Sequence, residues 1–283
     1  MNRQVLLLLL LLLPCVAYTQ PKPARLIIRG DDMGYTHSGN LALIKCYKEG
    51  IEKSIEVIVP SPWFPEAVKM LNANPGVDVG IHLALSSEWD NVKWRPLTNC
   101  PSLRDSNGYF FPMIYPNKDY PQQAMLENNW KIADIEAEFR AQIEMALKHI
   151  SRISHVSAHM ACARVNDEVK ALTKRLAIEY KIDIDPEDYG VKWLGFDKPN
   201  KTSAERLQTF LDLLNTLEPG KTYMYLEHPG LNDAELQAVH HIGYEDVAVH
   251  RQGITDMFIS NKVKAFIKKK NIQLISYKDL LNK

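Results

Sequence analysis

Short apolar runs alternate with amphipathic segments along most of the chain. An apolar run at 26–28 stops at Gly30, and Leu41, Ile44 and Tyr47 then recur at the spacing of one helical face. This alternation predicts an α/β fold with a parallel sheet and right-handed helical crossovers. About seven strand–helix units result, one short of a full (β/α) barrel. The predicted strands are 26–28, 54–59, 77–83, 154–159, 182–184, 222–226 and 272–276, and the predicted helices are 38–50, 63–74, 132–150, 166–180, 203–217 and 259–270.

Residues 84–130 interrupt the alternation with a long segment rich in Pro, Asn, Trp and Tyr. A long irregular segment inside a compact domain is usually an active-site loop or lid. Its aromatic side chains either offer apolar faces that suit sugar rings or pin the segment to the core. These aromatic residues are Trp89, Trp94, Tyr109, Phe110 and Phe111.

The first 19 residues have the pattern of a secretory signal peptide. Arg3 supplies the positive charge, and residues 5–13 form an unbroken apolar run. The run is too short to span a bilayer, which takes about 20 apolar residues. We therefore expect a signal peptide at 1–19, a single domain at 20–283, no stable membrane span, and a secreted or periplasmic protein.

Composition narrows the range of partners. The chain has 283 residues, of which 46% are hydrophobic and 24% charged, which is enough for the core of a large α/β domain. The formal net charge is zero and no basic stripe stands out, so nucleic acid is not an expected partner. The three cysteines beyond the signal segment have the spacing of neither a disulfide framework nor a zinc site. The sequence leaves a homodimer open.

Two adjacent carboxylates, Asp31 and Asp32, follow the first predicted strand. Catalytic groups and ligands in barrels and open α/β sheets lie just beyond the carboxyl ends of strands. Adjacent residues that leave a strand point in different directions, so the two carboxylates are expected to do different jobs. An Asx turn or a helix N-cap is an equally weighted alternative at this point.

Histidines occupy the exits of three later predicted strands. His82 ends the strand at 77–83, His159 ends the strand at 154–159, and His228 follows the strand at 222–226. Each histidine alone is more often a structural residue than a ligand. Because the carboxyl ends of parallel strands meet at one rim, four such exits together predict a shared site.

A carboxylate and two imidazoles form a three-ligand metal site with open positions, as metal-assisted hydrolysis requires. We assign Asp32, His82 and His159 as ligands of one divalent cation, Mg²⁺ or Zn²⁺. Asp31 is then the general base, and His228 is the acid or the oxyanion partner.

Several stretches resemble the YdjC-like carbohydrate deacetylase family, in family order from Leu26 nearly to the C-terminus. The stretches are LIIRGDDMGY, SIEVIVPSPWFPEAVKML, NPGVDVGIHLALSSEW, WRPL, SLRDSNGYFF, SHVSAHM, EHPG and IQLISYKDLL. The resemblance implies a distorted (β/α), TIM-like barrel and a divalent-metal hydrolase that removes acetyl groups from N-acetylated amino sugars or oligosaccharides. Carried over by position, it implies metal ligands at Asp32, His82 and His159 and a base at Asp31.

The chain departs from the family pattern near the second metal histidine. Many members have an aspartate where this chain has Ser157, and further histidines where it has Met160, Ala161 and Ala163. A carboxylate beside a ligating imidazole orients that ring and strengthens metal binding. Its loss predicts weaker metal binding or a changed metal preference. Arg29 also stands where a small polar residue is more usual.

Other polar residues are weaker candidates. Trp94 and Arg95 are assigned to the wall of the substrate pocket, because they lie in the segment after His82. Arg251 is interpreted as a member of a surface ion pair and His155 as structural. His240, His241 and His250 lie in a polar stretch and are expected to be exposed.

Two other functions compete with the deacetylase. A retaining glycoside hydrolase would use Asp31 and a second carboxylate about 5–5.5 Å away, without a metal. A non-catalytic sugar-binding protein would keep the aromatic residues and carry a degraded metal site, which Ser157 favours and the intact aspartates and histidines oppose.

Overall fold

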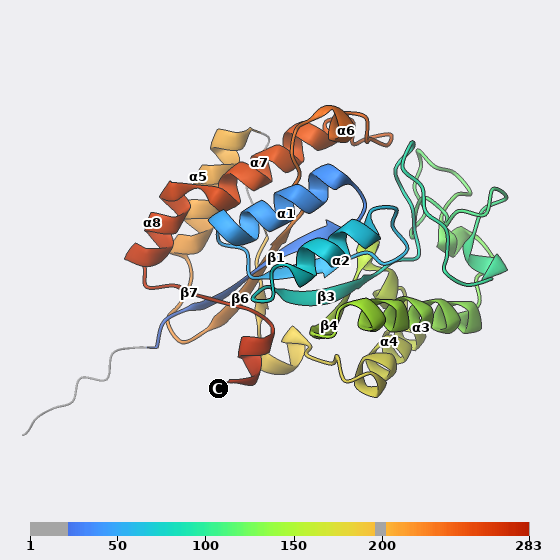
Figure 1. Cartoon of the computed structure of the whole chain (residues 1–283), viewed down its shortest axis with the longest axis horizontal. Helices are drawn as coiled ribbons and strands as arrows, with labels where there is room; N and C mark the ends of the chain where they lie inside the picture. Colours follow the sequence, from blue (N-terminus) through green and yellow to red (C-terminus); the bar gives the residue numbers. More distant parts are fainter. Residues whose placement is uncertain (1–21, 196–201, 283) are drawn as a thin grey trace, which may run out of the picture.

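The strand that carries Asp31 and Asp32 lies at the centre of a parallel sheet (Figure 1). This strand, β1 (Arg25–Met33), pairs along one edge with β6 (Thr222–Glu227). Its other edge pairs first with β7 (Gln273–Ile275) and then with β2 (Ser54–Val57). Both edges of β1 are therefore covered, and eight of its nine residues are buried. The structure, a computed structural model, describes residues 22–195 and 202–282, so the predicted signal segment lies outside the described residues.

The sheet has seven strands and curves into a half-barrel. Its order is β4-β3-β2-β1-β6-β5, and every pairing is parallel. The expected α/β fold, a distorted TIM-like barrel, is therefore confirmed. The remaining strands are β3 (Asp78–Leu83), β4 (Ile153–Ala158) and the two-residue β5 (Lys192–Trp193).

Helices cover the outer face of the sheet (Figure 1). The sequence predicts most of them to within a few residues, because their apolar positions recur every three to four residues. The helices are α1 (His37–Glu49), α2 (Phe64–Asn72), α3 (Ile132–His149), α4 (Asp167–Glu179), α5 (Ser203–Asn215), α6 (Ala234–Gln237), α7 (Val247–Ile259) and α8 (Asn261–Lys269). None of the helices in the described ranges is long and apolar enough to span a bilayer.

Two features of the second half of the chain differ from the predictions. Helix α7 occupies a region where no helix was predicted, because its buried positions mix apolar Val247 and Phe258 with polar Arg251. The strand expected at 182–184 is irregular, and the strand of that region is β5 instead.

A tight turn after Asp32 connects β1 to α1. Gly34 has a φ of 108°, and a side chain there would collide with the hydroxyl of Ser61, so the turn requires glycine. The Gly34 amide donates a 2.7 Å hydrogen bond to the side chain of Asn40. Thr36 caps α1 by accepting a hydrogen bond from the Gly39 amide. The exit of β1 is therefore held in one conformation.

The predicted irregular segment, 84–130, is present and packs at one end of the sheet (Figure 1). Its only regular elements are two short 3₁₀ turns, at Pro101–Leu103 and Met125–Glu127. Trp89, Trp94 and Phe110 are buried in the main core. These three aromatic residues therefore pin the segment to the sheet, which was the second of the two roles expected for them.

Candidate metal centre

Asp31 and Asp32 lie inside β1, close to its end. The pairing of β1 with β2 shifts register between Gly30 and Met33, and Asp32 has a φ of 69°. Asp is among the non-glycine residues that tolerate this left-handed conformation. The irregularity turns both carboxylates toward one histidine: His82 Nε2 lies 3.5 Å from Asp32 Oδ1 and 3.8 Å from Asp31 Oδ2. Adjacent residues of a regular strand would point to opposite faces.

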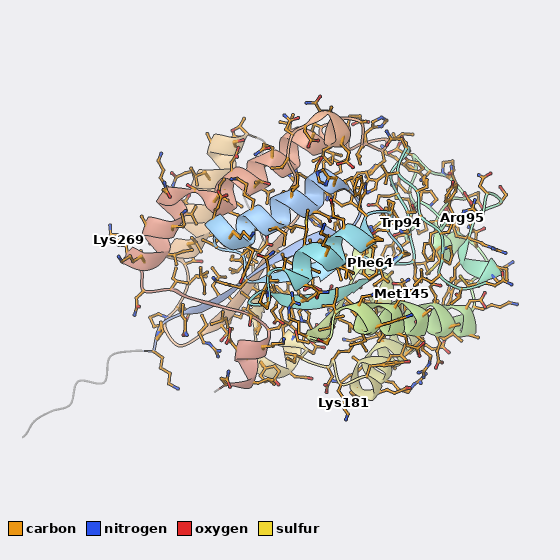
Figure 2. The ribbon with its side chains drawn as sticks, viewed as in Figure 1. Phe64, Trp94, Arg95, Met145, Lys181 and Lys269 are labelled. Carbon is orange, nitrogen blue, oxygen red and sulfur yellow. The ribbon has the colours of Figure 1, made fainter. Side chains whose placement is uncertain are left out.

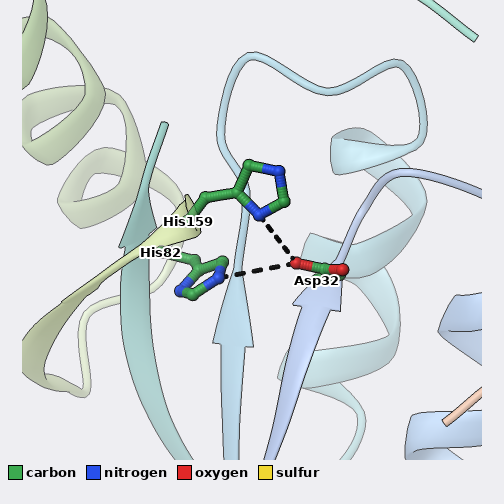
Figure 3. A group of neighbouring side chains, drawn as sticks. All are labelled: Asp32, His82 and His159. Carbon is green, nitrogen blue, oxygen red and sulfur yellow. Dashed lines mark hydrogen bonds and ion pairs between the residues drawn. The ribbon is translucent and has the colours of Figure 1, made fainter. Parts of the chain in front are cut away.

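Asp32, His82 and His159 converge on one point at the rim of the half-barrel (Figure 3). Each offers one ligand atom, and the three atoms lie within 4.8 Å of one another. His159 Nδ1 lies 3.0 Å from Asp32 Oδ1. The side chains come from the exits of β1, β3 and β4. The strand exits therefore meet as the sequence predicts.

A carboxylate lies behind each imidazole. His159 Nε2 is 2.9 Å from Glu88 Oε2, and Glu88 is buried in the irregular segment. His82 Nδ1 is 2.7 Å from Ser157 Oγ, whose hydroxyl donates a 2.5 Å hydrogen bond to Glu56. Although position 157 carries no carboxylate, two other carboxylates support the imidazoles: Glu56 of β2 and Glu88 of the irregular segment.

The second oxygen of Asp32 is held by Arg251 of α7. Arg251 Nη2 donates a 2.9 Å hydrogen bond to Asp32 Oδ2, and the arginine is only 3% exposed. Its guanidinium lies over the rings of Tyr35, at 4.7 Å, and Trp89, at 5.2 Å. The interpretation of Arg251 as a surface residue was wrong, because α7 packs this side chain against the site.

The charged groups around Asp32 and His159 shift the pKa values of both residues. Burial raises the pKa of Asp32, but His159, His228 and Arg251 hold it well below its usual range. Burial lowers the pKa of His159, but Glu88 and Asp32 raise it to about 10. The metal-free site therefore holds an ionised Asp32 beside a protonated His159.

Asp31 is oriented by Arg29, two residues earlier on β1. Arg29 Nε and Nη2 donate hydrogen bonds of 2.7 Å to the two oxygens of Asp31. Arg29 Nη1 donates a 2.9 Å hydrogen bond to the hydroxyl of Tyr277. This bidentate geometry fixes the plane of the Asp31 carboxylate. Arg29, which stands where a small polar residue is more usual in the family, therefore orients Asp31.

His228 lies on the solvent side of the site. It follows β6, its side chain is 35% exposed, and its Nε2 lies 3.9 Å from Asp32 Oδ2. Partial burial lowers the pKa of His228, but Asp32 and Glu227 outweigh it and the pKa is raised. Among the predicted metal ligands and catalytic residues, His228 is therefore the one most accessible to a ligand from solution.

The two residues assigned to the substrate pocket are neighbours in the irregular segment (Figure 2), but one is buried and the other exposed. Trp94 is 3% exposed, packs in the main core, and has its ring 6.2 Å from that of His159. Arg95 is exposed, and its guanidinium lies 4.9 Å from the ring of Tyr109. Trp94 therefore borders the site from inside the protein, whereas Arg95 lies on the surface of the irregular segment.

The remaining histidines lie outside the centre. His155 is fully buried against Glu56 and Tyr277, in agreement with its structural interpretation. His240 is exposed as expected. His241 and His250 are half-buried, so the expectation that they are exposed was wrong. His250 Nδ1 lies 2.8 Å from the hydroxyl of Tyr244, within hydrogen-bond distance.

Sequence reasoning missed Glu56 and Glu88. Glu56 lies in β2, where all four residues are buried, so no alternation of polar and apolar positions marks it. A charged residue inside so apolar a run was the one available signal, since such residues are rarely buried unless paired. Glu88 lies in an irregular segment, where no periodic pattern indicates which side chains turn inward.

A comparison with protein families matches residues 25–269 to the model described as YdjC-like protein. The chain belongs to the YdjC-like family. This YdjC-like protein is 25% identical to carbohydrate deacetylase 2 of Listeria innocua, over 92% of this chain and 100% of that protein. It is 29% identical to the carbohydrate deacetylase of Clostridium beijerinckii, over 90% of this chain and 100% of that protein.

A solved structure supports the fold of this YdjC-like protein. It comes from Enterococcus faecalis V583 and is described as a candidate cellobiose-phosphate cleavage protein. The two structures superpose with a TM-score of 0.72 at 24% sequence identity, over 92% of this chain and 99% of the other.

Proposed function

We propose that this protein is a metal-dependent hydrolase that removes acetyl groups from N-acetylated amino sugars or their oligosaccharides. The observation that carries the proposal is the convergence of Asp32, His82 and His159, with Asp31 beside them. The reaction class is supported by the relatives that are named carbohydrate deacetylases.

The donor set fits one divalent cation. Asp32 Oδ1, His82 Nε2 and His159 Nδ1 would be the ligands, since the other nitrogen of each ring is already bonded to Ser157 or Glu88. Three protein ligands with open positions are typical of catalytic sites, and two imidazoles favour Zn²⁺ over Mg²⁺. A bound cation would polarise the acetyl carbonyl and lower the pKa of a water molecule.

Asp31 is positioned to act as the general base. Arg29 uses one lone pair of each Asp31 oxygen, which leaves the other lone pairs free to accept a proton. Asp31 Oδ2 lies 3.8 Å from the metal-facing nitrogen of His82, and so beside the position that a metal-bound water would take. The two hydrogen bonds from Arg29 keep the Asp31 carboxylate from rotating out of this position.

His228 is suited to the acid step. Asp32 and Glu227 raise its pKa, which favours the protonated ring, and its partial exposure lets it reach a bound substrate. When the amide breaks, the amino sugar leaves as an amine that requires a proton. His228 would donate that proton, or would stabilise the oxyanion before the bond breaks.

The proposal extends to the location of the protein. The charged and apolar pattern of residues 1–19 supports export to the periplasm or the exterior. N-acetylated sugar polymers are substrates that an exported enzyme would meet.

One assay tests the proposal against its competitors. We expect N-acetylglucosamine oligomers to release acetate in the presence of Zn²⁺ or Mg²⁺, and a chelator to abolish the release. New reducing ends without acetate, insensitive to the chelator, would indicate a glycoside hydrolase. Binding of the oligomers without either product would indicate a sugar-binding protein.

A further inference from the structure

A continuous hydrogen-bonded path joins Glu56 to His82 through Ser157. Ser157 Oγ lies 2.5 Å from Glu56 Oε2 and 2.7 Å from His82 Nδ1. We propose that Glu56 acts through this hydroxyl as the positioning carboxylate of His82, and so fixes the tautomer and orientation in which His82 binds a metal. The inference rests on the proposed function in that it takes His82 as a metal ligand.

The direction of the two hydrogen bonds follows from the groups involved. An ionised carboxylate only accepts, so the single hydrogen of the Ser157 hydroxyl is donated to Glu56. Ser157 Oγ can then only accept from His82, which places the ring hydrogen on Nδ1. In the neutral ring the lone pair of His82 therefore lies on Nε2, the atom that faces Asp32 at 3.5 Å. This is the tautomer that a cation at the site needs.

Strand register brings these residues into line. His82 of β3 is the direct neighbour of Ser157 on β4, and Gly80 is flanked by Glu56 on β2 and His155 on β4. Gly80 has no side chain, so Glu56 and His155 meet across β3 at 2.6 Å. A Cβ at position 80 would collide with both of them. Glu56 is thereby anchored with no exposure to solvent.

The two imidazoles of the site are therefore supported in different ways. His159 contacts its carboxylate, Glu88, directly at 2.9 Å. His82 reaches its carboxylate, Glu56, through a serine, because the hydroxyl of Ser157 contacts the ring but carries no charge of its own. Glu56 and Ser157 together thus orient the ring of His82, as a single aspartate at position 157 would.

Metal affinity tests the role of the hydroxyl. We expect Ser157→Ala to weaken Zn²⁺ binding to the metal-free protein by about 10- to 100-fold, measured by competition with a chelating dye. Ser157→Thr keeps the hydroxyl and should restore affinity to within about threefold, since Ser157 borders a cavity of about 620 Å³ with room for a methyl group.

Thr173→Val is the matched control. Thr173 borders the same cavity as Ser157, and its hydroxyl donates a 2.9 Å hydrogen bond to the backbone carbonyl of Val169 rather than to the path from Glu56 to His82. We expect this variant to keep its Zn²⁺ affinity to within about threefold. Equal losses in Thr173→Val and Ser157→Ala would mean a general effect on the wall of the cavity and would overturn the inference.

A double-mutant cycle tests whether Glu56 acts through Ser157. Glu56→Gln alone should weaken Zn²⁺ binding about 10-fold or more, but should change the affinity of Ser157→Ala by less than about threefold. Additive losses would show that Glu56 acts by another route. In parallel, ¹⁵N NMR of the metal-free protein should show the His82 hydrogen on Nδ1, and a mixture of tautomers in Ser157→Ala.

The outcomes separate this inference from the proposed function. Absence of Zn²⁺ and Mg²⁺ binding in the unaltered protein would remove the metal-dependent hydrolase and the inference together. Metal binding and acetate release that survive unchanged in Ser157→Ala would overturn the inference alone.

Discussion

Arg251 donates a 2.9 Å hydrogen bond to Asp32, although the two residues are 219 positions apart in the chain. The contact places a buried cation on one oxygen of Asp32, while the other oxygen faces His82 and His159. Among the described residues, Nε and Nη1 of Arg251 have no hydrogen-bond partner, and the guanidinium packs against aromatic rings instead. Asp32 is therefore held from one side and left free to bind a cation on the other.

Removal of Arg251 should destabilise the metal-free protein more than the metal-bound one. Arg251→Met removes the guanidinium from one oxygen of the buried Asp32 and leaves His159 as its remaining close partner. Breaking a buried ion pair typically costs about 3–5 kcal/mol. A bound cation would neutralise Asp32, so metal should raise the melting temperature of Arg251→Met more than that of the unaltered protein. Arg140→Met, which breaks two ion pairs near the surface, should cost about 1 kcal/mol or less. An equal metal-induced shift in Arg251→Met and the unaltered protein would contradict this.

The two adjacent aspartates should separate metal binding from turnover. Asp31→Asn should keep the metal and lose acetate release by about 100-fold or more, because it removes the base and leaves the three ligands intact. Asp32→Asn should lose both, because it replaces a ligand. Metal content by mass spectrometry and acetate release should be measured on the same samples. Equal metal loss in the two variants would contradict this division of roles.

Metal binding should become tighter as the pH rises. The metal-free protein holds His159 protonated, because Glu88 and Asp32 raise its pKa to about 10, whereas a ligand must be neutral. Each cation should therefore displace about one proton from His159, and the apparent Kd should fall about tenfold per pH unit between pH 6.5 and 8.5. Calorimetry in buffers of different ionisation enthalpy counts the protons released. A Kd independent of pH would exclude the displacement.

Glu56 should stabilise the fold at neutral pH and lose this effect in acid. Burial raises the pKa of Glu56, but His155 and Arg29 hold it at about 2, against about 4.5 in the unfolded chain. The stabilisation is therefore present above pH 4.5 and is lost as the pH falls toward 2. Glu56→Gln should cost on the order of 3 kcal/mol at pH 7 and less at pH 3, measured by urea unfolding. Glu136→Gln, which weakens a partly exposed ion pair, should cost less than about 1 kcal/mol.

Trp94 and Arg95 should differ sharply in their effect on stability. Trp94 is buried in the main core, so Trp94→Ala should cost about 3–5 kcal/mol. Arg95 is exposed, and Arg95→Ala should change stability by less than about 0.5 kcal/mol. Chemical denaturation of the two variants checks this. A loss above 2 kcal/mol for Arg95→Ala would mean that its contact with Tyr109 holds the irregular segment in place.

Most of the scaffold was predictable because its signals are local. The apolar run of β1 and the helical spacing in α1 and α3 identify these elements from a few neighbouring residues. Helix α7 was missed because Arg251, Gly253 and Thr255 interrupt its buried apolar positions, so that no clear helical period marks it. Its burial follows from packing against α1 and α5.

The chain by itself determined the order of strands and helices and the placing of Asp32, His82 and His159 at strand exits. These properties follow from the period of the backbone and from the rule that parallel strands end at one rim. Tertiary structure alone decided which groups stand behind the ligands. Glu56 reaches its partners across Gly80, and Arg251 arrives from a distant helix. Such contacts depend on strand register and helix packing, which no local pattern of residues encodes.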